Sequence, residues 1–242
     1  EIGALALGVA LAGPAQALQA TATSGRDNTL YSLSGDLSNG AGEHIFAGRT
    51  GARGGLMTLR SVIAFDLAGL LPADAVVDDV RLVLTQTSPR PRFEGTLGVH
   101  RLQQAFGEGT STAGMGEGGG AAETPGDATW EDAIVGMSTW NTPGGDFDLV
   151  PLATAPAFGA TVELSSMSLV QDVQQALDAG AMSFGWLLKL SDETLPAIRY
   201  GSFQNTGGNG PQLVIDYSVV PEPGTAPLLA LGLVGLAARR RA

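Results

Sequence analysis

Hydrophobic and polar residues alternate with a period of two along most of the chain. In residues 60–67, Val62 and Ala64 occupy one face of an extended segment, and Ile63 and Phe65 occupy the other. Because successive side chains of a β-strand point to opposite faces, this alternation predicts a strand. Comparable segments, separated by clusters of Gly, Pro, Asn and Asp, are residues 60–67, 76–85, 96–102, 160–164, 184–190, 198–203 and 212–219. They predict an all-β fold, an antiparallel, jelly-roll-like β-sandwich.

A different period follows the fourth of these segments. Ser168 begins a serine-x-x-glutamine sequence, which is the form of a helix capping box. Val173 and Leu177 then follow at helical spacing, and Gly180 stands where a C-terminal cap is common. We expect one short amphipathic helix over residues 169–179, packed over one end of the sandwich.

The alternating segments also predict the core. Residues 18–219 have the length of a single large β-domain. Its core should contain one inward face from each main strand, namely Phe65, Leu82, Leu84, Val99, Trp186, Leu188, Val214 and Ile215.

Charge and cysteine content exclude several functional classes. The chain has a formal net charge of −11, and Lys189 is its only lysine. Nucleic-acid binding depends on clustered lysine and arginine, so no nucleic-acid partner is expected. Because cysteine is absent, neither a disulfide framework nor a thiolate metal site can form.

The N-terminal region has the pattern of a secretory signal peptide. Residues 2–12 are apolar, and Ala15 and Ala17 flank one residue in a small-x-small arrangement. We expect residues 1–17 to be a signal peptide that signal peptidase cleaves after Ala17, leaving Leu18 as the first residue of an exported protein.

The C-terminal region contains three ordered elements. One of them is an uncharged stretch, residues 226–238. As a helix it would span roughly 20 Å, less than the roughly 30 Å of a bilayer core, so it suits a transient membrane segment better than a permanent anchor. The arginines that follow it should stay on the cytoplasmic side. The elements are Pro221-Glu222-Pro223, the uncharged residues 226–238, and Arg239-Arg240-Arg241.

Residues 220–242 therefore resemble the PEP-CTERM sorting signal of Gram-negative bacteria. The resemblance implies transient insertion in the inner membrane and removal of the tail by an exosortase near Pro221-Glu222-Pro223. It also implies that the processed protein is extracellular or lies at the cell surface, within the extracellular matrix or exopolysaccharide layer.

The body of the chain contains further recognisable segments, namely residues 27–31, 38–42, 46–50, 60–67 and 71–75. These segments resemble the DNRLRE-type domain, a second family, related to archaeal disaggregatase. Residues 126–130 and 140–147 are similar to segments of exported PEP-CTERM relatives. The resemblance implies an extracellular β-sandwich found on repetitive surface proteins, some of them attached to polysaccharide-active enzymes, and it does not imply catalysis.

Two tryptophans stand in a segment of small polar residues. Trp130, Trp140, Asn141 and Asp146 surround a Pro-Gly-Gly turn. Indole faces can stack on sugar rings while amide and carboxylate groups hold hydroxyls, so these four are candidate ligand-binding residues. Alternatively, the tryptophans close the core, because buried aromatic rings contribute a large apolar area. We expect Trp140 to pack inside and Trp130 to be the more exposed.

Calcium is the one cofactor that the sequence suggests, as a structural ion. Asp127, Asp146 and Asp148, with nearby carbonyls, could supply the oxygen ligands that this cation prefers. The chain has no EF-hand spacing.

Catalytic motifs are absent. The two histidines, His44 and His100, do not form an H-E-x-x-H sequence, and no G-x-S-x-G sequence occurs. The glycine-rich residues 107–126 lack a basic residue and predict a flexible surface loop rather than a phosphate-binding site. We expect a non-catalytic surface or matrix protein, structural or adhesive, in weak contact with exopolysaccharide. The alternatives are a carbohydrate-binding module, with an exposed aromatic row, and a polysaccharide lyase or hydrolase, with a deep cleft.

Overall fold

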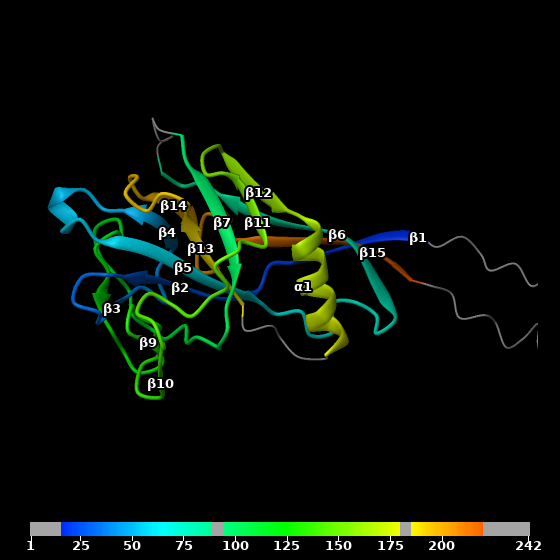
Figure 1. The fold of residues 1–242 in the computed structure, drawn as a ribbon, viewed down its shortest axis with the longest axis horizontal. Coiled ribbons are helices and arrows are strands. Elements are labelled where there is room, and N and C mark those ends of the chain that lie inside the picture. The colour runs from blue at the N-terminus through cyan, green and yellow to red at the C-terminus, as the bar shows by residue number, and fades with distance from the viewer. Residues whose placement is uncertain (1–15, 89–93, 180–184, 220–242) are drawn as a thin grey trace, which may run out of the picture.

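The computed structural model describes residues 16–88, 94–179 and 185–219, which form antiparallel strands and a single α-helix (Figure 1). Within those ranges, no helix is long and apolar enough to cross a membrane. The apolar targeting helices expected over residues 1–17 and 220–242 lie outside the described residues, apart from residues 16 and 17, which begin a strand.

Two antiparallel sheets form the body of the molecule. The four-stranded sheet has the order β1 (Gln16–Ala22), β15 (Gln212–Val219), β6 (Ala75–Thr85) and β12 (Thr161–Ser165). The seven-stranded sheet has the order β11 (Ala153–Pro156), β7 (Thr96–Arg101), β13 (Trp186–Leu190), β5 (Thr58–Phe65), β4 (His44–Arg49) and β14 (Ile198–Gly201), with β2 (Gly25–Tyr31) also paired to β5. This confirms a mostly β fold, while the jelly-roll arrangement stays a prediction.

Shorter elements complete the fold. Strand β3 (Leu37–Ser38) pairs with β8 (Ala121–Ala122), and β9 (Asp132–Ile134) pairs with β10 (Ser138–Thr139). A 3₁₀ turn covers Ala52–Gly54, and α1 spans Met167–Asp178.

The main core contains side chains from both sheets and from α1. Seven of the eight side chains expected in it are buried there, namely Phe65, Leu82, Leu84, Val99, Trp186, Leu188 and Ile215. The prediction for Val214 is wrong, since this side chain is only partly buried. Val214 and Ile215 are neighbours on β15, so they point to opposite faces and only one can enter the core.

Strand β5 is buried on both faces. Ile63 and Phe65 belong to the main core, whereas Val62 and Ala64 join a second apolar cluster with Trp140. The division between the two faces is the one that the alternation predicts. The outer face of the seven-stranded sheet is therefore covered by the connection between β7 and β11, which contributes Trp140 to this cluster.

The helix begins two residues earlier than predicted. Ser166, rather than Ser168, is the N-cap, and its hydroxyl accepts a hydrogen bond of 3.0 Å from the Leu169 amide. Leu169 and Val173 bury one face of α1 in the main core, so the expected packing of an amphipathic helix onto the strands is confirmed. The expected cap Gly180 lies outside the described residues.

Candidate ligand-binding surface

Trp140 is a core side chain. Only 5% of its surface is exposed, and its indole Nε1 donates a hydrogen bond of 3.0 Å to the Thr129 carbonyl. It packs in the second cluster with residues such as Leu30 and Leu187. Its faces are therefore occupied by the protein itself rather than available for stacking on a sugar.

Trp130 is half-buried and is covered by an arginine. The guanidinium carbon of Arg60 lies 4.8 Å from the centre of the Trp130 ring and 5.4 Å from that of Phe147. A Cβ atom added to Gly144 would lie 2.7 Å from a Trp130 ring atom. The protein thus contacts the indole ring closely at Arg60 and at Gly144, and Trp130 does not form a bare platform.

Arg60 is held over the aromatic rings by a network of its own. Its Nε and Nη2 donate to the two carboxylate oxygens of Glu193 at 2.7 and 3.0 Å, and Nη1 donates to the Gly144 carbonyl at 2.8 Å. The ammonium of Lys189 lies 3.5 Å from the same carboxylate. This bidentate geometry fixes the plane of the guanidinium.

Asn141 and Asp146 come together, but they bind each other. The Asp146 carboxylate, 7% exposed, accepts hydrogen bonds from Asn141 N, Asn141 Nδ2 and Thr142 N at 2.7, 2.9 and 2.9 Å. Gln104 Nε2 adds a fourth bond at 2.9 Å. The carboxylate therefore closes the turn over residues 141–146.

The acids expected to hold calcium are engaged separately. Asp127 accepts from Thr124 N at 2.6 Å and from Thr124 Oγ1 at 3.0 Å, and Asp148 accepts from Gln103 Nε2 at 3.0 Å. Among the residues that the structure describes, no three His, Asp or Glu side chains gather so that they could hold a metal ion. Asp127, Asp146 and Asp148 are thus not brought into one site.

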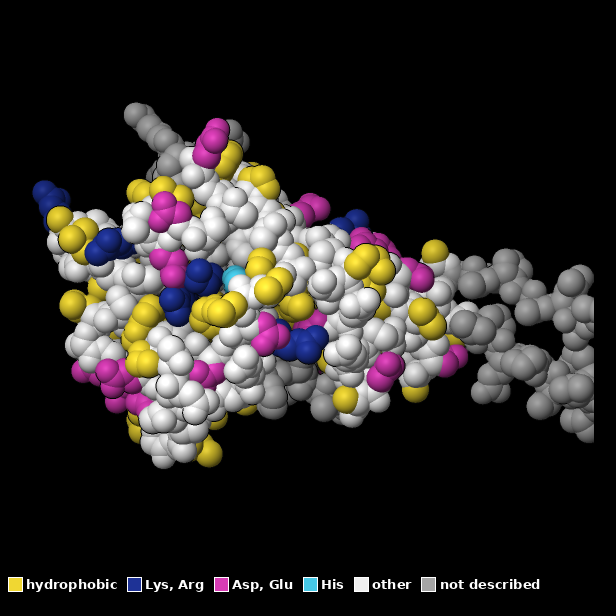
Figure 2. Space-filling view, viewed as in Figure 1, with side chains coloured by type: hydrophobic (Ala, Val, Ile, Leu, Met, Phe, Trp, Pro, Cys, Tyr) yellow, Lys and Arg dark blue, Asp and Glu magenta, His cyan; other side chains and the backbone are white. Residues whose placement is uncertain are grey.

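An open groove of about 560 Å³ adjoins this region, between the chain after Phe147 and α1. Leu149 and Val150 are exposed at its edge. Its polar side chains are Arg101, Gln103, Asp148, Ser168, Gln171 and Gln175. In Figure 2, hydrophobic side chains gather in the middle of this face beside a histidine, between groups of Lys and Arg side chains. Amide and guanidinium groups beside apolar residues suit a neutral or anionic polyhydroxyl ligand.

The groove rests on an ion pair between a partly exposed arginine and a buried aspartate. Arg101 on β7 meets Asp172 on α1, and the other carboxylate oxygen of Asp172 accepts a hydrogen bond of 2.7 Å from Trp186 Nε1. Asp172 is only 3% exposed. Both of its oxygens are thus used to join the helix to the seven-stranded sheet.

His100 lies beneath the aromatic residues. Its Nδ1 is 2.8 Å from the Asp148 carbonyl oxygen, and its ring meets Phe147 edge to face at 5.2 Å. Burial, more than the nearby Lys189 and Arg60, lowers the pKa of the imidazole below its ordinary value. The neutral ring therefore donates Nδ1–H to the carbonyl and serves to position the Phe147 segment.

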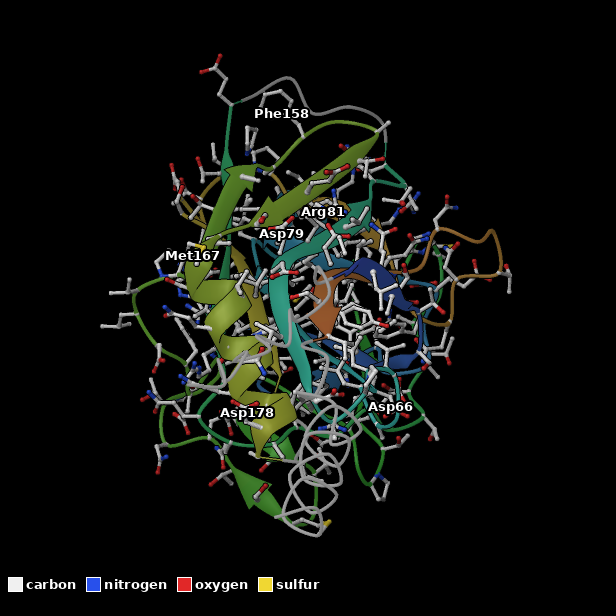
Figure 3. The ribbon with its side chains drawn as sticks, turned by 90° about the vertical axis from the view of Figure 1, so that its right-hand side faces the viewer. Asp66, Asp79, Arg81, Phe158, Met167 and Asp178 are labelled. Carbon is white, nitrogen blue, oxygen red and sulfur yellow. The ribbon has the colours of Figure 1, made fainter. Side chains whose placement is uncertain are left out.

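The outer face of the four-stranded sheet carries charged side chains, among them Asp79 and Arg81, which lie close together in Figure 3. Arg81 on β6 lies 3.0 Å from Asp216 on β15 and 3.8 Å from Asp79. These groups are partly exposed, so their mutual attraction is screened and adds little to stability.

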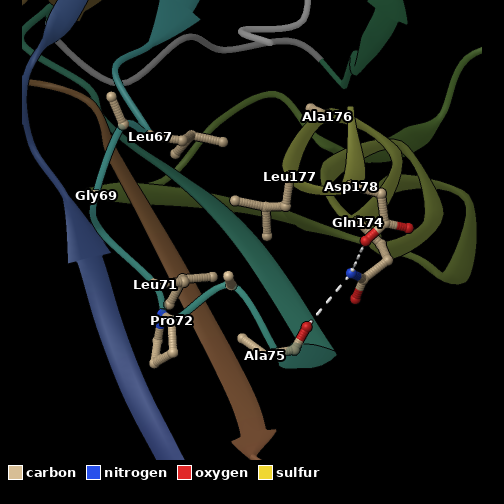
Figure 4. A pocket seen from close by; sticks show the side chains of 11 residues that line it. Leu67, Gly69, Leu71, Pro72, Ala75, Gln174, Ala176, Leu177 and Asp178 are labelled. Carbon is tan, nitrogen blue, oxygen red and sulfur yellow. Dashed lines mark hydrogen bonds between the residues drawn. The ribbon is translucent and has the colours of Figure 1, made fainter. Parts of the chain in front are cut away.

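A second, more apolar pocket of about 320 Å³ lies at the end of the molecule where β15 ends (Figure 4). Leu67, Leu71 and Leu177 line it, and Gln174 Nε2 donates to the Ala75 carbonyl at 3.4 Å and to Asp178 at 2.8 Å. Ala75 pairs with Val219, so the chain leaves β15 beside this pocket.

The glycine-rich residues 107–126 lie largely at the surface, as predicted, and hydrogen bonds to residues far away in the sequence hold parts of the segment in place. The predicted flexibility stays a prediction. Asn28 Nδ2 donates to the Glu108 carbonyl at 2.8 Å, and Asn39 Oδ1 accepts from the Ala113 amide at 2.8 Å. The Glu117 carboxylate accepts from the His44 amide and from Asn39 Nδ2, both at 2.9 Å. These partners are about 70–80 residues apart in sequence, and no local pattern marks them.

Of the predicted processing residues, the structure describes Ala17, which pairs with Ser218 in the β1–β15 ladder. The others lie outside the described residues, namely Ala15, Pro221, Glu222, Pro223, Arg239, Arg240 and Arg241.

The comparisons with known proteins bear on the C-terminal tail. A family model described as the PEP-CTERM protein-sorting motif matches residues 219–241. No curated protein matches the chain. The chain therefore carries a PEP-CTERM sorting signal, which marks a secreted protein that is targeted to the cell envelope and processed by an exosortase.

Proposed function

We propose that this protein is a non-catalytic component of the surface or extracellular matrix of a Gram-negative bacterium, with a structural or adhesive role. The proposal rests on the position at which the folded β-domain meets the C-terminal sorting signal. Strand β15 ends at Val219, the residue at which the sorting motif begins. The β-domain therefore ends where the signal starts, and removal of the signal would leave the domain intact.

The position of the N-terminal strand supports the same proposal. Gln16 on β1 pairs with Val219 on β15, so β1 begins and β15 ends at one end of the molecule (Figure 1). Cleavage by signal peptidase after Ala17 would still leave Leu18–Ala22 paired with β15. Both membrane-directed segments can thus be attached to, and removed from, the same end of a folded domain.

The groove beside Phe147 favours contact with exopolysaccharide as the second part of the role. Gln103, Gln171, Gln175 and Arg101 offer amide and guanidinium hydrogen bonds along an open surface next to exposed apolar side chains. An open groove suits a chain that passes over the protein better than a single trapped sugar. The alternatives remain a dedicated carbohydrate-binding module and a polysaccharide lyase or hydrolase.

A non-catalytic role agrees with the state of the acidic groups nearest the groove. Asp172 is bound by Arg101 and Trp186, and Asp148 accepts from Gln103. Glycosidases need two carboxylates facing the scissile bond, one of them free to act as an acid. The carboxylates here are already engaged in holding α1 and the groove wall.

Intact-mass analysis of the exported protein tests the processing. We expect a mature protein that begins at Leu18 and lacks the residues after about Gly224. Replacing the three C-terminal arginines together (Arg239→Glu, Arg240→Glu, Arg241→Glu) should abolish this truncation, because the positive cluster sets the orientation of the segment in the membrane. A full-length C-terminus on the wild-type exported protein would contradict the proposal.

Binding of the exported protein to a glycan array tests the polysaccharide contact. We expect weak binding to extended acidic or neutral polymers that falls at least several-fold in Gln175→Ala, which removes a groove amide from an exposed helix position. Gln19→Ala, on the edge strand β1, which contributes no residue to the groove, should bind like the wild type. Cleavage of any polymer would instead favour the enzyme, and an unchanged affinity in Gln175→Ala would remove the groove from consideration.

A further inference from the structure

Three segments bring oxygen-bearing side chains together at the free edge of β2. Asp27 lies on β2, Glu108 in the connection after β7, and Gln204 in the connection after β14. Glu108 Oε1 lies 3.4 Å from the Asp27 amide nitrogen and 2.7 Å from Gln204 Nε2. The Asp27 carboxylate reaches the third segment through its Oδ2, which accepts from the Phe203 amide at 2.8 Å.

Two oxygens in this cluster have no hydrogen-bond donor. Asp27 is completely buried, and its Oδ1 has no partner within the described part of the chain. The same holds for the buried Gln204 Oε1. Unpartnered polar atoms are rare in protein interiors because each one loses its hydration without compensation. Two unpartnered acceptors beside a second carboxylate point to a positively charged ligand.

Neither Asp27 nor Glu108 forms an ion pair with a described side chain. The charge of Arg26 acts on Glu108, but its guanidinium lies over the Phe106 ring at 5.0 Å, and its buried Nε donates no hydrogen bond to either carboxylate within the described residues.

The backbone around Glu108 is fixed in advance. Asn28 Nδ2 donates to the Glu108 carbonyl at 2.8 Å, and a Cβ atom on Gly40 would lie 1.5 Å from that same oxygen. Only glycine permits this approach. Contacts of its backbone thus hold Glu108 against β2. Of its carboxylate, Oε1 already accepts from Gln204 Nε2, whereas Oε2 accepts no hydrogen bond within the described part of the chain and is open to a ligand.

We propose that Asp27, Glu108 and Gln204 bind a hard divalent cation of the calcium class, at a site separate from the acids that the sequence suggests. All three side chains would bind the ion through oxygen atoms, which suits calcium better than zinc or copper. Water would complete the six to eight ligands that calcium takes. Two carboxylates and an amide make a weak site, as in extracellular modules. The ion would join β2 to the two connections that cover its free edge.

The test uses the exported protein, stripped with a chelator and titrated with calcium chloride. We expect calorimetry to detect one site with a dissociation constant of about 10⁻⁴ to 10⁻³ M. Saturating calcium should raise Tm by several degrees, because a ligand that binds only the folded state stabilises it. Magnesium should do so less, since it demands regular octahedral geometry.

Variants locate the site. Asp27→Asn and Glu108→Gln should each lose the calcium-dependent rise in Tm, while Asp148→Asn and Asp66→Asn should keep it. If Asp27→Asn does not fold, Glu108→Gln decides, and a retained calcium response in it would overturn the proposal. The proposal also fails if about 10 mM calcium, well above the expected constant, leaves the wild type unchanged. A response lost in Asp148→Asn alone would place the ion at the other acids.

Discussion

Trp140→Ala should lower the free energy of unfolding by about 3–5 kcal/mol, the usual cost of truncating a buried aromatic side chain. The indole is 5% exposed and lies in the second apolar cluster, on the outer face of the seven-stranded sheet. Its removal leaves a cavity next to Leu187 and Val62 and leaves the Thr129 carbonyl without the indole N–H. Urea denaturation followed by circular dichroism measures the change.

Two further variants show whether burial is the cause. Trp140→Phe keeps most of the apolar area and loses only the hydrogen bond to Thr129, so it should cost clearly less. Leu149→Ala removes a side chain that is 85% exposed in the same connection between β7 and β11, and we expect a change within about 0.5 kcal/mol. A Trp140→Ala protein as stable as Leu149→Ala would show that the indole is not part of the core.

The strands could be predicted from the sequence because their signal is local. On β5, alternation alone assigns Ile63 and Phe65 to one face of the strand. On β6, it assigns Val80, Leu82 and Leu84 to one face, and both of these faces line the main core. The error at Val214 arises where a partly buried strand carries several apolar residues in a row. The apolar run of β15 does not show which of its residues faces inward, and its pairing with β6 decides it.

The candidate surface was less predictable, because its decisive contacts join residues far apart in the chain. Trp130 reads as a possible sugar platform until Arg60, 70 positions earlier, is seen to lie over its ring. In the sequence, the Asp146 carboxylate looks available for a ligand, but in the structure the backbone amides of its own turn already donate hydrogen bonds to it. Polar side chains that form such contacts do not recur at a regular spacing along the chain. The sequence alone therefore does not show which of them are hydrogen-bonded within the folded protein.

The largest effect of a polar substitution should come from Asn28→Ala, because one buried amide joins three segments. Its Oδ1 accepts from the Thr29 amide at 2.7 Å and from the Ser38 hydroxyl and Asn39 amide at 3.0 Å. Its Nδ2 donates to the Glu108 carbonyl. Each buried group left without a partner costs about 1–3 kcal/mol, so we expect a total loss of at least about 3 kcal/mol.

Asn141→Ala is the matched control for this prediction. Its amide is exposed and donates a single bond to Asp146, so its loss should cost less than about 1 kcal/mol in the same urea titration. Asn28→Asp keeps the three accepted bonds and removes the donor to Glu108, and it places a carboxylate near Asp27 and Glu108. We therefore expect it also to destabilise, and to speed hydrogen exchange of the Ala113 amide, which the glycine-rich connection contributes to this network. If Asn28→Ala cost no more than Asn141→Ala, the connection would be held by Asn39 and Glu117 without Asn28.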